Sequence, residues 1–364
     1  MSKRFLLIVL LLLVAPPLDR ASAGYLDENP DEVFAAVYER LGVRLPERAA
    51  RDAFVWLRLE ELKREPCDQK SIEDLAAALD KLGYRREAAE GQLNFVRKCG
   101  APTAALHRSV NIYLKLTDFP KAFEAADEFV RREPTNHNAR YLRGVALEGL
   151  GELRRALVDY AEAVELFNGD RKSISSSVFL REAGVYAALG QYCEAATPIM
   201  TWVALDPVSR DTSRSQKMIN DYEQRGNCAA SKEFHAERFP VRGQKNVVLV
   251  KAEINGVRGT FILDTGASYL SMKAEFAERA KISLDGANEI MLATANGLAK
   301  GRLSKAGKVQ LGKLEAVNVP AVVQKTESAS YGSNVDGLLG MSFLARFEVQ
   351  MAGGFIEVRT RRPK

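Results

Sequence analysis

The sequence predicts a multidomain protein in which an all-α region precedes an all-β region. Residues 69–209 repeat with a period of 34 residues, and their apolar positions follow the 3.6-residue spacing of amphipathic helices. After residue 240 the apolar pattern changes to the two-residue alternation of β-strands. Short strand-like runs then succeed one another over residues 241–364. We therefore expect a helical solenoid followed by a closed, barrel-like β domain.

Composition indicates an ordinary globular protein. The 364 residues are 46% hydrophobic and 27% charged, which leaves room for two domains. The net charge of +5 is small for this length, and no basic run is interleaved with aromatic residues. The sequence therefore predicts no nucleic-acid partner. The basic tail, which contains Arg359, Arg361, Arg362 and Lys364, is expected to be a solvated chain end.

The N-terminal segment has the pattern of a secretory signal peptide. Lys3 and Arg4 precede an apolar run from Phe5 to Ala15, and Ala21-Ser22-Ala23 then offers a cleavage site of small residues. We predict a signal peptide over 1–23 and export across the inner membrane to the periplasm. The alternative is an uncleaved segment that anchors the protein, although the run is short for a bilayer span. No other long apolar segment follows in the sequence, so we expect no integral span in the mature chain.

The helical region is expected to contain a cap over 24–68 and repeats over 69–228. The four copies fall at 69–102, 103–136, 137–170 and 176–209, with residues 171–175 inserted before the last copy. A small residue recurs at one position of every copy, and a glycine stands five residues earlier in three of them: Ala88, Ala122, Ala156 and Ala195, with Gly83, Gly151 and Gly190.

This pattern resembles the tetratricopeptide repeat, in which small residues let two antiparallel helices pack closely. An unrelated helical bundle with similar spacing is the alternative. The resemblance implies a concave surface that binds a peptide or a partner protein, and the alternative role is that of a spacer.

The four cysteines are predicted to form two disulfides, because an exported protein meets an oxidising environment. Sequence alone allows three connectivities. In an antiparallel helical hairpin the start of the first helix lies beside the end of the second, which favours Cys67–Cys99 and Cys193–Cys228. A zinc site is the poorer interpretation, since no C-x-x-C motif occurs and the three histidines are far apart in the sequence.

The C-terminal region is expected to start after a linker over 229–240 and to occupy 241–364. A hairpin turns at Asn255-Gly256, and a second one turns at Ala295-Asn296-Gly297. The predicted strands are Val247–Ile254, Thr260–Leu263, Glu289–Thr294, Leu298–Ser304, Lys308–Leu311, Glu315–Val323, Phe347–Met351 and Phe355–Arg359, with short helices over Met272–Ala280 and Ser342–Ala345.

The most informative motif follows the strand Thr260–Leu263. That strand leads directly into Asp264, which is followed by Thr265-Gly266-Ala267-Ser268. A buried carboxylate is costly unless hydrogen bonds or a shared proton compensate for its charge, so we expect a chemical role for Asp264. A second motif, Val335-Asp336-Gly337-Leu338-Leu339-Gly340, follows further along the chain.

Together the two motifs resemble the Asp-Thr-Gly loop and the apolar-apolar-Gly segment of bacterial retropepsin-like aspartic proteases. That family folds as a small β barrel, and two subunits each contribute one such loop. The resemblance implies that Asp264 is the catalytic residue of a homodimer and requires no cofactor or metal. It assigns loop support to Thr265, Gly266 and Ser268, the floor of the loop to Leu338, Leu339 and Gly340, and the tip of a substrate-covering flap to Ala295, Asn296 and Gly297.

The predicted function is that of an exported aspartic endopeptidase whose helical arm recruits a protein substrate or partner. Asp336 precedes a glycine and lacks the loop motif, so we interpret it as a turn residue with a solvated side chain rather than as a second catalytic carboxylate. A serine or cysteine protease is excluded for this domain, because residues 236–364 contain no histidine. The alternative is a catalytically silent peptide-binding scaffold that dimerises through its β domain.

Overall fold

The structure is a computed structural model that describes residues 28–100, 103–228, 234–241, 247–294, 297–325, 331–332, 334–352 and 354–361. The chain divides into two compact units, Met1–Ala105 and Leu106–Lys364. The predicted signal peptide lies outside the described residues. Within them, no helix combines the length and apolar character that a membrane span requires.

The first unit is helical. Asp52 and Asp68 cap two of its helices, because their carboxylates accept hydrogen bonds from the first free backbone N–H groups. A disulfide joins Cys67, just before one helix, to Cys99 at the end of the next, with 5.5 Å between the Cα atoms, and confirms the predicted pair. The helices are α1 (Pro30–Val33), α2 (Ala35–Leu41), α3 (Glu47–Ala50), α4 (Ala53–Arg64), α5 (Gln69–Lys81) and α6 (Arg85–Cys99).

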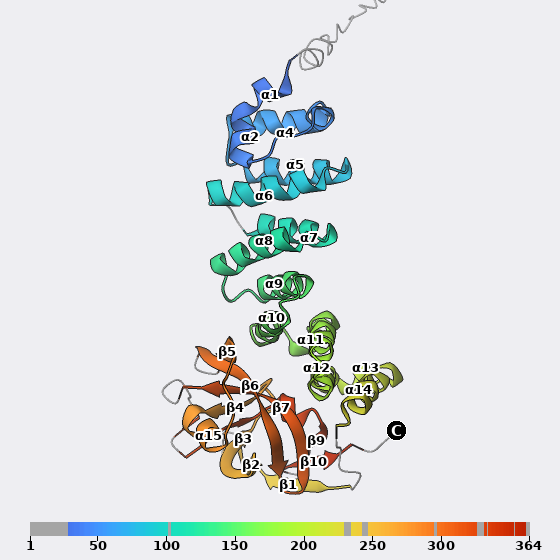
Figure 1. Cartoon of the computed structure of the whole chain (residues 1–364), viewed down its shortest axis with the longest axis vertical. Helices are drawn as coiled ribbons and strands as arrows, with labels where there is room; N and C mark the ends of the chain where they lie inside the picture. Colours follow the sequence, from blue (N-terminus) through green and yellow to red (C-terminus); the bar gives the residue numbers. More distant parts are fainter. Residues whose placement is uncertain are drawn as a thin grey trace, which may run out of the picture. The chain divides into compact units, whose positions relative to one another are not determined.

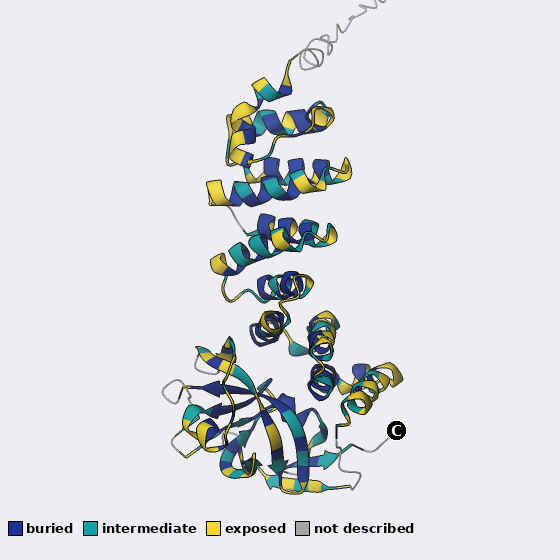
Figure 2. Cartoon of the chain, in the orientation of Figure 1, coloured by how far each residue is buried: buried dark blue, intermediate teal, exposed yellow. Residues whose placement is uncertain are grey.

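The second unit contains the remaining helical repeats and the β domain (Figure 1). The predicted copies each form one helical hairpin, and Figure 2 shows the buried faces along which these helices pack. The helices are α7 (Ala104–Lys115), α8 (Phe119–Arg132), α9 (His137–Gly149), α10 (Leu153–Glu165), the 3₁₀ helix η2 (Arg171–Ser173), α11 (Ser176–Ala188), α12 (Tyr192–Leu205), α13 (Pro207–Arg210) and α14 (Ser213–Gly226).

The glycines of the 34-residue period stand where the chain turns between the two helices of a repeat. Gly151 and Gly190 have φ angles of 76° and 72°, in the left-handed region that glycine adopts at little cost. Thr117 occupies the same position in the second copy and also has a positive φ, 55°. The second copy therefore lacks the glycine of the sequence pattern but keeps the left-handed turn, at the energetic cost that a non-glycine residue has there.

The second disulfide ties α14 to the last repeat. Cys193 in α12 bonds Cys228, which follows α14, and the Cα atoms are 5.6 Å apart, as predicted. The predicted capping helix Ser213–Gln224 is α14, extended to Gly226. Two disulfides indicate an oxidising, non-cytoplasmic environment.

The β domain is a closed sheet with a second, smaller sheet beside it. The large sheet has the order β2-β3-β8-β4-β7-β6-β5, and β2 also pairs with β6, which closes the barrel that the sequence predicted. The small sheet has the order β1-β10-β9. The elements are β1 (Ala236–Pro240), β2 (Val248–Ile254), β3 (Val257–Leu263), β4 (Leu270–Lys273), α15 (Ala274–Arg279), β5 (Glu289–Thr294), β6 (Gly297–Leu311), β7 (Leu314–Gln324), β8 (Gly337–Leu339), α16 (Met341–Leu344), β9 (Phe347–Ala352) and β10 (Phe355–Thr360).

Three elements of the β domain differ from the sequence prediction. The start of the predicted helix Met272–Ala280 belongs to strand β4, whose first three residues are all buried and so show no alternation. The strands predicted at 298–304 and 308–311 are one continuous strand, β6, which pairs with β7. The predicted linker 229–240 contains β1, a largely exposed strand that pairs with β10.

The last repeat and the barrel share one hydrophobic core. Ile199 and Met200 of α12 belong to the same buried cluster as Val319 of β7 and Leu344 of α16. Polar contacts border this core, since Lys305 of β6 forms an ion pair with buried Glu194 of α12 at 2.8 Å. The helical array of the second unit is therefore packed against the β domain rather than joined to it only by a linker.

Candidate active site

Asp264 stands directly after β3, where that strand passes into the loop to β4. The backbone N–H of Gly266 donates a hydrogen bond to Asp264 Oδ1 at 2.8 Å. The N–H of Asp264 itself donates to the Leu339 carbonyl at 3.1 Å. The side chain is half-buried, while Thr265 and Gly266 are exposed. One carboxylate oxygen is thus held by the loop, and the loop is anchored to β8.

The predicted floor lies beneath this loop. β8 runs parallel to β3, with Leu338 beside Ile262 and Leu339 beside Leu263. The N–H of Met341 donates to the Ala267 carbonyl at 2.8 Å, so the start of α16 also binds the loop.

Gly340 permits this close approach of the floor to the loop. A Cβ atom at position 340 would lie 2.3 Å from the Tyr269 carbonyl oxygen and 2.7 Å from that of Ala267. Both contacts are with backbone, which cannot turn aside as a flexible side chain could. The Leu-Leu-Gly segment is therefore brought together with the Asp264 loop as the sequence predicted, and the glycine has a steric reason.

The Ser268 hydroxyl has a partner that the sequence did not predict. Arg171 of η2 donates from Nη2 to Ser268 Oγ at 2.7 Å, and from Nη1 to the Gly266 carbonyl at 3.2 Å. Ser268 is buried beside Glu165 of α10. The role of Ser268 toward Asp264 stays a prediction.

The predicted flap is the hairpin β5–β6. Its tip residues Ala295 and Asn296 lie outside the described residues, and Gly297 begins β6 with a φ of 107°. The strand β5 lies beside α10 (Figure 1), where Glu162 accepts a hydrogen bond from the Met291 N–H at 2.7 Å.

Apolar side chains extend this contact between the hairpin and the helical array. Ile290 and Leu292 of β5 pack in one buried cluster with Ala161 of α10. The base of the hairpin is thus attached to the helices through both a hydrogen bond and a small apolar cluster.

Asp336 does not join Asp264. Its carboxylate accepts hydrogen bonds from the Thr260 N–H at 2.8 Å and from Arg279 at 3.1 Å. Thr260 precedes Asp264 by four residues along an extended strand, which corresponds to about 13 Å. These contacts are structural, as expected of a residue outside the catalytic pair, but the carboxylate is half-buried and bonded rather than solvated, so that part of the prediction was wrong.

A cluster of buried acids behind the loop was missed by the sequence analysis. Burial raises the pKa of Glu182 in α11 to about 8; the hydrogen bond from Tyr269 lowers that pKa, and the neighbouring Glu165 raises it. Burial also raises the pKa of Glu165, while the Ser268 hydroxyl and the Arg171 charge lower it. Each of these glutamates interrupts an apolar helical stripe, and Arg171 lies in the insertion that breaks the 34-residue period. Those interruptions were the available signal.

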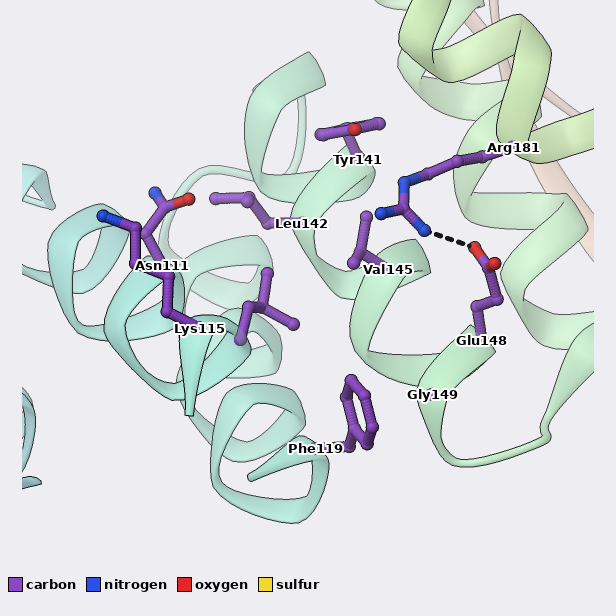
Figure 3. Close-up of a pocket in the computed structure, with 10 residues that line it drawn as sticks. Asn111, Lys115, Phe119, Tyr141, Leu142, Val145, Glu148, Gly149 and Arg181 are labelled. Carbon is purple, nitrogen blue, oxygen red and sulfur yellow. Dashed lines mark hydrogen bonds and ion pairs between the residues drawn. The ribbon is translucent and has the colours of Figure 1, made fainter. Parts of the chain in front are cut away.

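A second concave feature lies on the helical array, away from the barrel. It is a groove of about 490 Å³ lined by residues of α7, α8, α9 and α11. Figure 3 shows Lys115 and Asn111 on one side of it and Arg181 on the other, where Arg181 forms an ion pair with Glu148 at 2.9 Å. Tyr141, Leu142, Val145 and Phe119 supply apolar and aromatic surface between them.

The described residues contain no group of three or more histidine, cysteine, aspartate or glutamate side chains placed to hold a metal ion. The four cysteines are engaged in the two disulfides.

Comparison with known proteins finds a similarity for the β domain. Residues 250–343 match the family model described as aspartyl protease, and this range includes the Asp264 loop, the flap hairpin and the Leu-Leu-Gly floor. The C-terminal domain is therefore aspartic protease-like, and the helices before it form tetratricopeptide-like hairpins. No curated protein matches the chain.

Solved structures resemble the two regions separately. A retropepsin-like aspartic protease from Rickettsia conorii is 24% identical, with a TM-score of 0.28, over 35% of this chain and 92% of that chain. MamA from Desulfovibrio magneticus RS-1 is 17% identical, with a TM-score of 0.37, over 50% of this chain and 98% of that chain. YrrB, described as a TPR protein with an unusual peptide-binding site, is 16% identical, with a TM-score of 0.37, over 53% and 88%.

Proposed function

We propose that this protein is an exported aspartic endopeptidase that hydrolyses peptide bonds with a water molecule activated by the paired Asp264 carboxylates of a homodimer. The observation that carries the proposal is the placement of Asp264. Asp264 directly follows the core strand β3, next to the Leu-Leu-Gly segment that runs parallel to that strand. Its carboxylate accepts a hydrogen bond from the Gly266 N–H. The family match over residues 250–343 supports the same chemistry.

The chemistry requires two carboxylates. When they lie a few ångströms apart they cannot both ionise cheaply, so they share one proton and titrate as a coupled pair. The ionised member accepts a proton from the water that attacks the peptide carbonyl. The protonated member donates a hydrogen bond to that carbonyl oxygen and later supplies the proton of the leaving amine. Since each chain supplies one Asp-Thr-Gly loop, the second carboxylate comes from a second copy of the chain.

The helical array is proposed to bring a protein substrate or partner to this site. Its groove of about 490 Å³ offers hydrogen-bond donors on two sides and apolar surface between them. Such surfaces on stacked repeats commonly bind peptide segments. We further propose that the N-terminal segment directs export to the periplasm, an oxidising compartment in which the two disulfides are stable.

The proposal is tested with Asp264→Asn in the full-length protein, a substitution that nearly preserves shape. We expect it to abolish cleavage of an unstructured protein at mildly acid pH while the dimer, measured by sedimentation, persists. Asp285→Asn, which changes an exposed aspartate of the same domain, is the matched control and should cleave normally. Cleavage by Asp264→Asn at the parent rate contradicts the catalytic assignment, and full activity from a strictly monomeric preparation contradicts the homodimer.

A further inference from the structure

One guanidinium group of the helical array makes two hydrogen bonds with the Asp264 loop. Arg171 donates to two acceptors in that loop, the Gly266 carbonyl at 3.2 Å and the Ser268 hydroxyl at 2.7 Å. The N–H of the same Gly266 donates to Asp264 Oδ1 at 2.8 Å. Gly266 therefore links the two: its backbone N–H binds the Asp264 carboxylate, and its carbonyl oxygen binds Arg171 of the helical array.

The segment that carries Arg171 is itself fixed. Asp170 caps η2 by accepting a hydrogen bond from the Lys172 N–H at 3.0 Å. Arg210 of α13 donates to the carbonyl of Lys172 within the short helix and to that of Ile174 just after it. The guanidinium therefore projects from a restrained turn and not from a free loop, so its two hydrogen bonds require little further ordering of the backbone that carries it.

The Ser268 hydroxyl links the guanidinium to a buried acid. Because Arg171 is a donor only, Ser268 Oγ must accept from it, which leaves the hydroxyl hydrogen free to point at Glu165. Glu165 is 8% exposed and lies in α10, the helix that also holds the flap strand β5. Arg171, Ser268 and Glu165 form a chain of polar contacts on the side of the loop that faces the helices.

The exposed tip of the loop needs such a restraint. Thr265 and Gly266 are exposed, and glycine has more backbone freedom than other residues. A catalytic carboxylate must be held close to its productive geometry, and a displacement of about 1 Å can reduce the rate about 100-fold. β8 and α16 bind the backbone of the loop at Asp264, Ala267 and Ser268, and Arg171 adds a hydrogen bond to the carbonyl of Gly266 at its exposed tip.

We propose that Arg171 is a positioning residue of the active site, which orders the Asp264 loop from the helical array, so that the array is a structural part of the protease and not only a recruiting arm. This inference rests on the proposed function of Asp264. Arg171 does not touch the reacting groups in this arrangement; it acts through Gly266 and Ser268. A lysine at this position could donate from only one point and would not span both acceptors in the same way.

The test compares Arg171→Ala, Arg171→Lys and the control Lys172→Ala in the full-length protein, with a peptide that the parent cleaves. Lys172 is the adjacent cation and has an exposed side chain. Replacing it by alanine removes one positive charge and leaves the hydrogen bonds of Arg171 with the loop in place. We expect Arg171→Ala to lower kcat about 10- to 100-fold with KM within about threefold of the parent. Arg171→Lys should recover part of kcat, and Lys172→Ala should match the parent.

Hydrogen exchange of the peptide covering residues 264–270 provides a readout that does not depend on activity. We expect faster exchange in Arg171→Ala than in the parent, with an unchanged melting temperature. A kcat within twofold of the parent together with unchanged exchange overturns the inference, as does an effect confined to KM. If the parent itself has no activity that depends on Asp264, the proposed function fails, and exchange alone still decides whether Arg171 orders the loop.

Discussion

Replacing Glu182 by Gln is expected to remove a large pH-dependent loss of stability. Glu182 is buried at the contact between α11 and the Asp264 loop, where it is 6% exposed. The groups that face it are Tyr269 from the loop, Glu165 from α10 and Tyr186 from its own helix. No cation is among the causes of its shift, and burial raises its pKa from 4.5 to about 8.

The sign and size of the effect follow from this pKa. Between about pH 4.5 and pH 8 the folded protein keeps a proton on Glu182 that the unfolded chain releases. Its stabilising contribution is therefore complete below about pH 4.5 and is lost as the pH rises through about 8. A difference of about 3.5 pH units, at about 1.4 kcal/mol per unit, corresponds to a loss of at most about 5 kcal/mol. Glutamine has no proton to release and should not show this loss.

The assay is thermal unfolding of the parent and Glu182→Gln at pH 5 and pH 8.5. We expect nearly equal melting temperatures at pH 5 and an increase of about 10 °C in the variant at pH 8.5. Glu278→Gln, which changes an exposed glutamate of α15, is the control and should follow the parent at both pH values. If the parent and Glu182→Gln lose the same stability between the two pH values, Glu182 is not protonated in the folded protein and the reasoning is wrong.

Three further outcomes are expected from the packing of the second unit. Gly340→Ala should shift the Asp264 loop, because the new Cβ atom would lie 2.3 Å from a backbone carbonyl oxygen. We expect the free energy of unfolding, measured with denaturant, to fall by about 1–3 kcal/mol, and kcat for peptide cleavage to fall as well. An unchanged kcat would argue against a close-packed floor. Replacing both Cys193 and Cys228 by serine should lower the free energy of unfolding by about 4 kcal/mol, because the disulfide closes a loop of 35 residues. A decrease of less than about 1 kcal/mol would contradict a stabilising role for this disulfide. Lys115→Glu in the groove should raise KM for a protein substrate with little change in kcat, whereas Lys217→Glu, an exposed control in α14, should change neither; an unchanged KM for Lys115→Glu would count against recruitment through the groove.

The features that the sequence predicted correctly depend either on contacts within one repeat or on a short motif that can be recognised by itself. The 34-residue period located the helical hairpins because each repeat packs on itself and on the next one. The same hairpin geometry placed Cys67 beside Cys99, within bonding reach. The strand before Asp264 and the Leu-Leu-Gly segment were identified by their motifs, and the structure pairs them as parallel neighbours.

The features that were missed join segments far apart in sequence. β1 is polar and largely exposed, so its pattern is that of a linker, and only its pairing with β10 at the far end of the domain makes it a strand. β4 is buried on both faces and therefore shows no alternation. The helix predicted over these residues was wrong at its start for that reason.

Local patterns of polarity and spacing were thus sufficient for the fold class, the repeats and the disulfides, while the catalytic roles assigned to the Asp264 loop and its glycine floor stay a prediction. Tertiary structure alone decided that the array and the barrel share a core, that Glu165 and Glu182 are buried between them, and that Arg171 binds a loop 95 residues away. The physical reason is that periodicity records which face of an element is buried, whereas the partner that covers this face depends on how the whole chain closes.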